Sequence, residues 1–339
     1  MEFVLPPWAL FFFPIFFFLA ALFWGAPPIA LLSEILSILR GKPFPARCAQ
    51  QMSRLAMKGH FGFWALALLG FLVLFVQPME SAPPVYTLFF FSAPVRLTAH
   101  LDWIAFVQAN PVLLFLSLLV PLCGTLLLAI YDLRWKQARE HRALHIILGC
   151  LANMAIKYSY WTLAVFSVLF FLGTPGIPPL SSQLWPFFTL WFPLSLYLAG
   201  ACGLAYLVVR RDKDNWGRDY YRFAAPYLAA WQLVTGSCVL AWYLWLWMSS
   251  HKTMNLFLPQ IWYPWLTSIL CLVLGMALSL MIRMSDNPMR LKGSMAAVLF
   301  LTYGQTLTLI VAVWETMSHY LPGWSLPTCM PALLKLLHG

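Results

Sequence analysis

Long apolar stretches alternate with short polar segments along the chain, and this pattern predicts membrane-spanning helices. A helix needs about 20 apolar residues to cross a hydrocarbon core of about 30 Å. Eight stretches reach that length, near residues 8–39, 56–77, 109–131, 145–172, 184–209, 222–249, 260–282 and 293–318. No repeat of about 20–50 residues and no low-complexity linker divides the chain. We therefore predict an all-α polytopic membrane protein with one integral membrane domain over residues 1–339.

Two adjacent prolines interrupt the first predicted span. Pro27 and Pro28 have no backbone N–H, so they leave the carbonyls of Phe23 and Trp24 without their helical donors. The chain up to the prolines is already long enough to cross the bilayer. Residues 29–39 therefore either continue a long tilted helix or lie along the inner membrane surface.

Composition supports a membrane protein. The 339-residue chain is 62% hydrophobic and 9% charged, whereas soluble domains are about 25% charged. Aromatic residues make up 17% of the chain, which suits rings that anchor at the bilayer interfaces. The formal net charge of +10 arises from clusters in short loops, so we expect the lipid bilayer and no nucleic acid as a partner.

The basic residues predict the orientation, because 17 of the 21 fall in the loops after spans 1, 3, 5 and 7. Loops rich in Lys and Arg face the cytoplasm. Both termini are then expected outside the cytoplasm, in a bacterial inner membrane, with the spans paired as four antiparallel hairpins. The 17 residues are Arg40, Lys42, Arg47, Arg54, Lys58, Arg134, Lys136, Arg139, Arg142, Arg210, Arg211, Lys213, Arg218, Arg222, Arg283, Arg290 and Lys292.

The predicted outer face is rich in aromatic residues. It contains a long connection over 78–108 and a tail over 319–339. The pattern favours either an interfacial aromatic belt or a docking platform for an extracytoplasmic redox partner. Its tryptophans are Trp8, Trp103, Trp185, Trp245, Trp247, Trp262, Trp265, Trp314 and Trp324.

The fourth span carries a polar stripe of His145, Gly149, Asn153 and Lys157, which recur every fourth residue. A lysine near the bilayer centre should face protein or water and have a partner. The stripe therefore predicts either a proton path with a quinone or substrate contact, or a hydrogen-bonded core. Candidate partners at the depth of Lys157 are Gln305, Tyr303, Thr306, Gln232 and Thr235.

Two acidic residues inside predicted spans are further candidates for this path. Glu34 shares a helical face with Ser33 and Ser37 near the inner surface. It is expected either to pair with a basic loop residue such as Arg40 or to handle protons. Glu315 lies near the outer end of the last span.

Two histidines at matching depth are candidates for binding b-type haem. His60 and His145 both lie near the inner ends of their spans. Haem b takes two axial ligands, commonly from different helices, whereas a lone interfacial histidine is usually an amphipathic anchor. No other metal site is expected.

The run from Glu34 to Gly41-Lys42, followed by a basic loop and a second span, resembles the first hairpin of cytochrome bd-type quinol oxidase subunit I. The resemblance covers residues 14–75 and implies antiparallel membrane helices that start outside, whereas the long quinol-binding loop of that family has no visible match here. That family has a haem-ligating histidine on its first span, but FFFPIFFFLAALFWG contains none. Oxygen reduction is therefore not expected.

We predict a quinone-interacting membrane subunit of a respiratory electron-transfer complex, with b haem at His60 and His145 as an option and with other subunits as partners. One alternative is a transporter or permease with Lys157 at a midplane substrate site. Another is a non-catalytic membrane scaffold or assembly protein.

Overall fold

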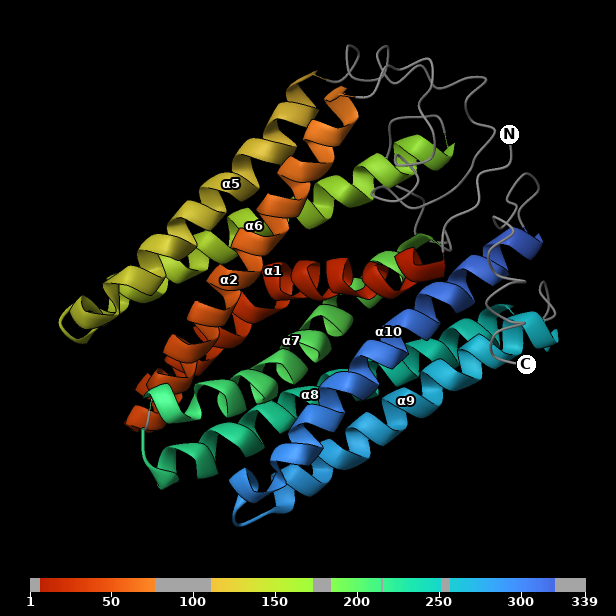
Figure 1. Cartoon of the computed structure of the whole chain (residues 1–339). Coiled ribbons are helices and arrows are strands. Elements are labelled where there is room, and N and C mark those ends of the chain that lie inside the picture. Colours follow the sequence, from red (N-terminus) through yellow and green to blue (C-terminus); the bar gives the residue numbers. More distant parts are fainter. Residues whose placement is uncertain (1–6, 77–110, 173–183, 215, 251–256, 321–339) are drawn as a thin grey trace.

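The computed structural model describes residues 7–76, 111–172, 184–214, 216–250 and 257–320, and all regular structure in these ranges is helical (Figure 1). This confirms the predicted all-α class. The elements are α1 (Pro7–Arg40), α2 (Pro43–Val76), α5 (Pro111–Leu133), η3 (Arg134–Arg139), α6 (Arg142–Leu172), α7 (Leu184–Asp214), α8 (Arg218–Ser250), α9 (Pro259–Met284), η4 (Pro288–Leu291) and α10 (Lys292–Tyr320).

Within the described ranges, six helical segments are long and apolar enough to cross a membrane, which indicates an integral membrane protein. They come from α1, α5, α7, α8 and α9, and from η4 together with α10. Their bounds are Pro14–Arg40, Phe115–Leu133, Thr189–Asp214, Arg218–Met248, Pro259–Met284 and Pro288–Val313.

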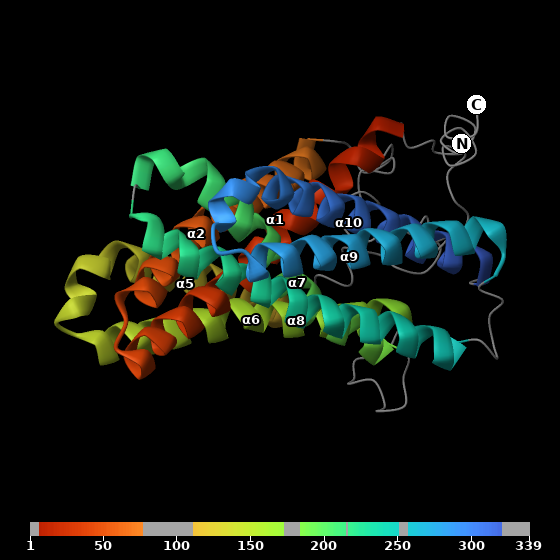
Figure 2. The same cartoon turned by 90° about the horizontal axis from the view of Figure 1, so that it is seen from below.

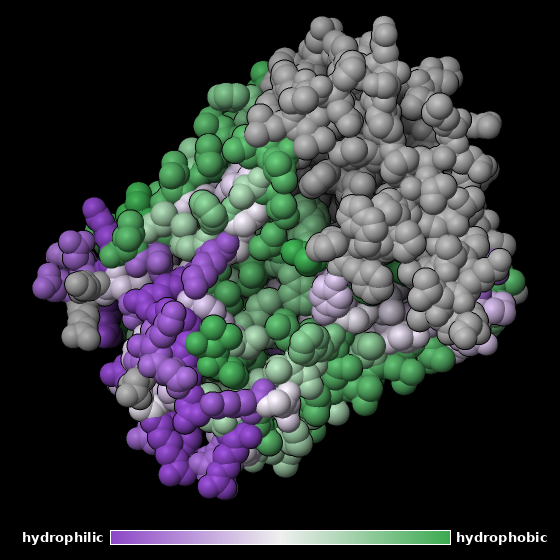
Figure 3. All heavy atoms as spheres, viewed as in Figure 1, coloured by the Kyte–Doolittle hydropathy of each residue, from purple (hydrophilic) through white to green (hydrophobic). Residues whose placement is uncertain are grey.

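Consecutive helices pack as pairs, α1 with α2, α5 with α6, α7 with α8, and α9 with α10. The four connections within these pairs lie at the same end of the molecule in both views (Figures 1 and 2). Hydrophilic residues gather at that end, while apolar side chains cover the helices beyond it (Figure 3). We call this the hydrophilic end.

Helix α1 lies at the centre of the bundle and contacts α2, α6, α7 and α10. It is one continuous helix through Pro27 and Pro28 to Arg40, so residues 29–39 continue the helix. Gly41, with φ +62°, ends it. Phe23, Ala26 and other buried α1 residues pack against α2 and α5–α8, and Ala21 joins a second apolar cluster with α7–α10.

A close approach of α1 to α7 depends on Gly25, because a Cβ there would overlap the backbone carbonyl of Ser195. We expect Gly25→Ala to force these helices apart and lower the free energy of unfolding by about 1–3 kcal/mol. Gly293 is a helical glycine with no atom within 4 Å of such a Cβ. Gly293→Ala should leave stability unchanged or raise it by up to about 1 kcal/mol. Unfolding in mixed micelles measures the stability of both variants. An equal change in the free energy of unfolding for the two would contradict the prediction.

The predicted connection 78–108 and most of the tail 319–339 lie outside the described residues.

Candidate proton-binding site

A buried acid and a buried histidine meet near the hydrophilic end. Glu34 lies shortly before α1 ends, and His145 lies in the first turn of α6. Glu34 and His145 are 3% and 4% exposed, and His145 Nδ1 is 2.7 Å from Glu34 Oε1. The Tyr131 hydroxyl of α5 donates to Glu34 Oε2 at 2.6 Å. Three helices thus converge on one carboxyl group.

The hydrogen-bond partners define how many protons the pair holds. His145 Nε2 is 2.9 Å from the Tyr131 carbonyl oxygen, which can only accept, so Nε2 carries a hydrogen. Nδ1 and Glu34 Oε1 must then share one proton. The pair is neutral overall whether that proton lies on the imidazole or on the carboxyl group, and short bonds of this kind are strong.

The end of α5 provides the Tyr131 carbonyl for this contact. Tyr131 lies in the last turn of α5, where carbonyls have no donor within the helix. His145 supplies that donor, and the partial negative charge at a helix C-terminus favours a positive imidazole there. The Tyr131 ring stacks on the His145 ring with centroids 4.2 Å apart. The Trp135 ring lies edge-on to the same His145 ring with centroids 4.7 Å apart. These rings fix the orientation of the imidazole.

The structure pairs Glu34 with His145, whereas the sequence suggested Arg40 or another basic residue, and Arg40 is exposed. Tyr131 and Trp135 were not predicted to belong to this site. Both lie at the junction of α5 and η3, outside any periodic polar pattern, and no sequence signal identifies them.

The structure does not bring the other predicted path residues to this pair. Asn153 Nδ2 donates to the Gly149 carbonyl in its own helix at 2.9 Å. Lys157 lies over the ring of Phe192, with Nζ 4.6 Å from the centroid. This cation–π contact occupies the ammonium group. Glu315 is buried near the opposite end of α10 from the hydrophilic end.

Gln305 instead belongs to a polar cluster between α7, α8, α9 and α10. Its Nε2 donates to the Tyr243 hydroxyl at 2.8 Å, and Ser268 Oγ donates to its backbone carbonyl at 3.1 Å. Gln232 similarly donates to the Tyr197 carbonyl at 2.9 Å. These buried bonds fix the register of four helices.

His60 has a structural partner for each ring nitrogen. Nε2 is 3.0 Å from the Phe23 carbonyl oxygen, which lacks a helical donor because of Pro27. Nδ1 is 2.9 Å from Thr125 Oγ1. Both nitrogens of His145 are likewise occupied. The two histidines therefore do not fit the role of haem ligands, which requires a free nitrogen on each.

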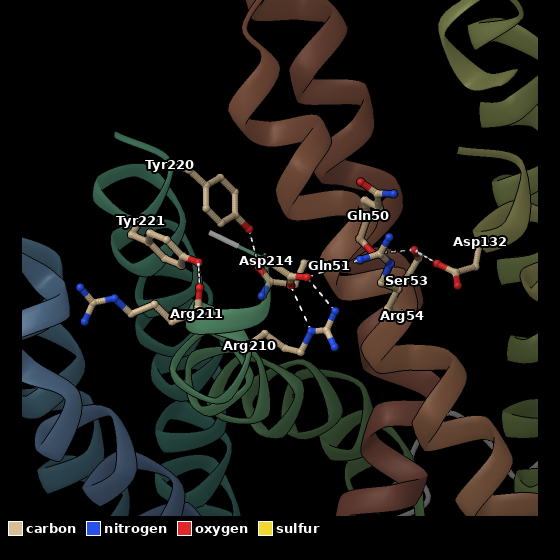
Figure 4. A network of polar contacts seen from close by, with 10 residues as sticks. All are labelled: Gln50, Gln51, Ser53, Arg54, Asp132, Arg210, Arg211, Asp214, Tyr220 and Tyr221. Atoms are coloured by element: carbon tan, nitrogen blue, oxygen red, sulfur yellow. Dashed lines mark hydrogen bonds and ion pairs between the residues drawn. The ribbon is translucent and has the colours of Figure 1, made fainter. Parts of the chain in front are cut away.

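Further polar contacts lie at the hydrophilic end (Figure 4). Ser53 of α2 donates to Asp132 of α5 at 2.5 Å. Arg210 binds Asp214 through two hydrogen bonds, of 3.1 and 2.7 Å, and Arg54 approaches the same carboxylate at 3.8 Å. Within the described residues, no group of three or more His, Cys, Asp or Glu side chains is arranged to hold a metal ion.

Comparison of the chain with protein-family models, curated proteins and solved structures finds no match.

Proposed function

We propose that the protein is an integral membrane subunit of a respiratory electron-transfer complex, in which the Glu34–His145 pair exchanges a proton with a quinone. The observation that carries this proposal is the buried carboxyl–imidazole contact of 2.7 Å. Ionisable groups buried in membrane helices are rare and commonly serve proton transfer. An imidazole and a carboxyl group are the usual general acids and bases of proteins.

The proposed chemistry uses the capacity of the pair for a second proton. A quinol that is oxidised to a quinone releases two electrons and two protons. The pair, which starts with one shared proton, takes one proton from the quinol and later returns it to water at the hydrophilic end. The second proton goes directly to water, and both electrons pass to another redox subunit of the complex.

The surroundings of the pair suit this substrate class. Tyr131 and Trp135 place aromatic rings against His145, and quinone sites combine an apolar, aromatic lining with few polar groups. The resemblance of residues 14–75 to a quinol oxidase hairpin supports the same substrate. Haem at His60 and His145 is not part of the proposal.

In the proposed topology, the chain crosses the membrane eight times, with the hydrophilic end in the cytoplasm of a bacterium and both termini outside. Support comes from the 17 basic residues that cluster in the loops after spans 1, 3, 5 and 7. The variants Lys42→Cys and Lys213→Cys test the orientation, because a membrane-impermeant thiol reagent should label these cysteines only from the cytoplasmic side of membrane vesicles. Access from the outer side would contradict it.

We also propose that a redox partner docks at the aromatic outer end of α8 and α9. Trp245, Trp247, Phe257 and Tyr263 are 41–61% exposed there. A photo-crosslinking residue in place of Tyr263 should form an adduct with a haem or iron–sulfur subunit of the complex. Adducts with lipid alone would instead identify an interfacial belt.

Photolabelling with an azidoquinone tests the quinone proposal on the full chain in liposomes. We expect saturable labelling of α1 or α6 near the pair, which excess decylubiquinone displaces. Glu34→Gln and His145→Asn should weaken this labelling by about tenfold, or about 1.4 kcal/mol of binding free energy.

The matched control is Glu140→Gln, which changes an exposed carboxylate in the turn between α5 and α6 and should leave the labelling unchanged. Labelling that cannot be saturated, or that is equal in all variants, would contradict quinone binding at the pair. The transporter hypothesis would then be tested next through Lys157.

A further inference from the structure

A second carboxylate lies beside the proton-binding pair, and no salt bridge to it is found among the described residues. Asp132 follows Tyr131 in the last turn of α5, and its Oδ1 accepts a hydrogen bond from Ser53 at 2.5 Å. In the part of the chain that the structure describes, no basic group lies within salt-bridge distance of Asp132. Arg54, the nearby cation on α2, has Asp214 as its ion-pair partner. A neutral hydroxyl thus binds this partly buried carboxylate.

Ser53 is arranged to bind Asp132 in either protonation state. Besides Asp132, its hydroxyl has a second acceptor within reach, the Gln50 carbonyl at 3.0 Å. When Asp132 is ionised, the hydroxyl donates to the carboxylate. When Asp132 is protonated, the carboxyl group can donate to Ser53 Oγ while the Ser53 hydroxyl turns to Gln50. The Trp135 indole donates to Ser53 Oγ at 3.0 Å, and a hydroxyl oxygen has two lone pairs, so this bond is compatible with either arrangement. No hydrogen bond is lost on protonation.

Asp132 is also coupled to His145. The peptide carbonyl between Tyr131 and Asp132 is the acceptor of His145 Nε2. The Trp135 side chain contacts His145 with its ring and reaches Ser53 with its indole nitrogen. The Asp132 carboxylate lies close enough to His145 and Arg54 for direct charge interactions.

We propose that Asp132 is a protonation switch that sets which partner of the Glu34–His145 pair holds the shared proton. The ionised carboxylate stabilises the imidazolium, so the proton lies on His145 Nδ1. When Asp132 takes a proton from water at the hydrophilic end, that stabilisation is lost, and the shared proton moves from Nδ1 to Glu34 Oε1. The imidazole is then neutral, and Glu34 is a carboxylic acid.

This protonation switch rests on the proposed function, because it acts on the same Glu34–His145 pair. It would make the pair's readiness to accept a proton depend on the pH at the hydrophilic end. Among the described side chains, the groups that face Asp132 are Ser53 and Arg54 from α2, His145 from α6 and the neighbouring Tyr131 of α5. Low pH at the hydrophilic end would place the shared proton on Glu34. High pH would return it to His145, which leaves Glu34 ionised and ready to accept a proton.

Infrared spectroscopy of the carboxyl groups tests the switch on the full chain in liposomes without a quinone. In the wild-type protein, we expect a protonated-carboxyl band that grows as the pH falls and that Glu34→Gln removes. In Asp132→Asn, the same band should be present at neutral pH, and the pH of its appearance should rise by at least about one unit, a tenfold change in the proton equilibrium. Asp132→Glu keeps the acid and should retain the pH dependence.

Glu140→Gln is the matched control and should leave the band unchanged. A Glu34 band with the same pH dependence in wild type and in Asp132→Asn would overturn the switch, as would a wild-type protein in which no band depends on Glu34. If Asp132→Asn fails to fold, the pH dependence of the Glu34 band in Ser53→Ala replaces it, and an unchanged dependence would be equally negative. The spectra do not depend on a quinone. A positive infrared result with negative photolabelling would therefore reject the proposed substrate and retain the switch.

Discussion

Replacement of His145 by leucine is expected to lower the free energy of unfolding by about 3–5 kcal/mol, because it leaves the buried Glu34 without its charged partner. The Tyr131 carbonyl loses its donor in the same variant. Glu34→Leu should have a similar effect, since it leaves the imidazole and the Tyr131 hydroxyl without the carboxylate that both contact. Unfolding of the purified protein in mixed micelles measures both changes.

The double variant distinguishes a buried pair from two independent packing defects. With both residues changed to leucine, no charge is left buried, so the loss should be smaller than the sum of the single losses by about 2 kcal/mol or more. Additive losses would contradict the coupling. Glu140→Ala removes an exposed carboxylate from the neighbouring turn and should change stability by less than about 0.5 kcal/mol.

The helical class could be predicted because the bilayer leaves few options. Without water in the hydrocarbon core, backbone groups must bond within the segment, so long apolar runs become helices. Helix ends were harder to predict. Helix α2 begins at Pro43, whereas the apolar run suggested residue 56. Charged residues such as Arg47 and Arg54 hide this first part of α2 from a hydrophobicity pattern, although it is helical and extends to the hydrophilic end.

The site could be predicted only in part. Glu34 and His145 stood out as ionisable residues inside predicted spans, but they are 111 positions apart and come together only because α6 packs on α1. The recurrence of polar residues at every fourth position correctly predicted that Asn153 and Lys157 lie on the same helix as His145. It carried no information about partners on other helices, and Lys157 contacts Phe192 of α7.

The prolines of α1 show both a feature that the sequence predicts and a long-range contact that it does not. The missing N–H of Pro27 predicts a free carbonyl at Phe23, and this follows from the sequence alone. The donor that replaces it comes from His60 on α2. The stacking of His60 on the Phe23 ring, with centroids 4.1 Å apart, holds the donor in place. A histidine that resembled a haem ligand in the sequence is thus part of the helix packing.

His60→Leu is expected to lower the free energy of unfolding by about 2–4 kcal/mol. The unpaired Phe23 carbonyl accounts for about 1–3 kcal/mol of this loss and the bond to Thr125 for about 1 kcal/mol. Leucine fills most of the vacated space, so the loss reports mainly on hydrogen bonding. The same unfolding assay in mixed micelles measures it.

Pro27→Ala provides the decisive control. It restores a backbone N–H at position 27, which can donate to the Phe23 carbonyl as in a regular helix. A carbonyl oxygen accepts two hydrogen bonds, so Pro27→Ala alone should be compatible with the His60 contact. In the Pro27→Ala background, His60→Leu should cost about 1–3 kcal/mol less than in the wild-type protein, since the carbonyl keeps a donor. An equal loss in both backgrounds would show that His60 stabilises the bundle by packing alone. A reduced loss would show that His60 supplies the hydrogen bond that proline removes, which lets α1 pass through Pro27 and Pro28 as one helix and place Glu34 against His145.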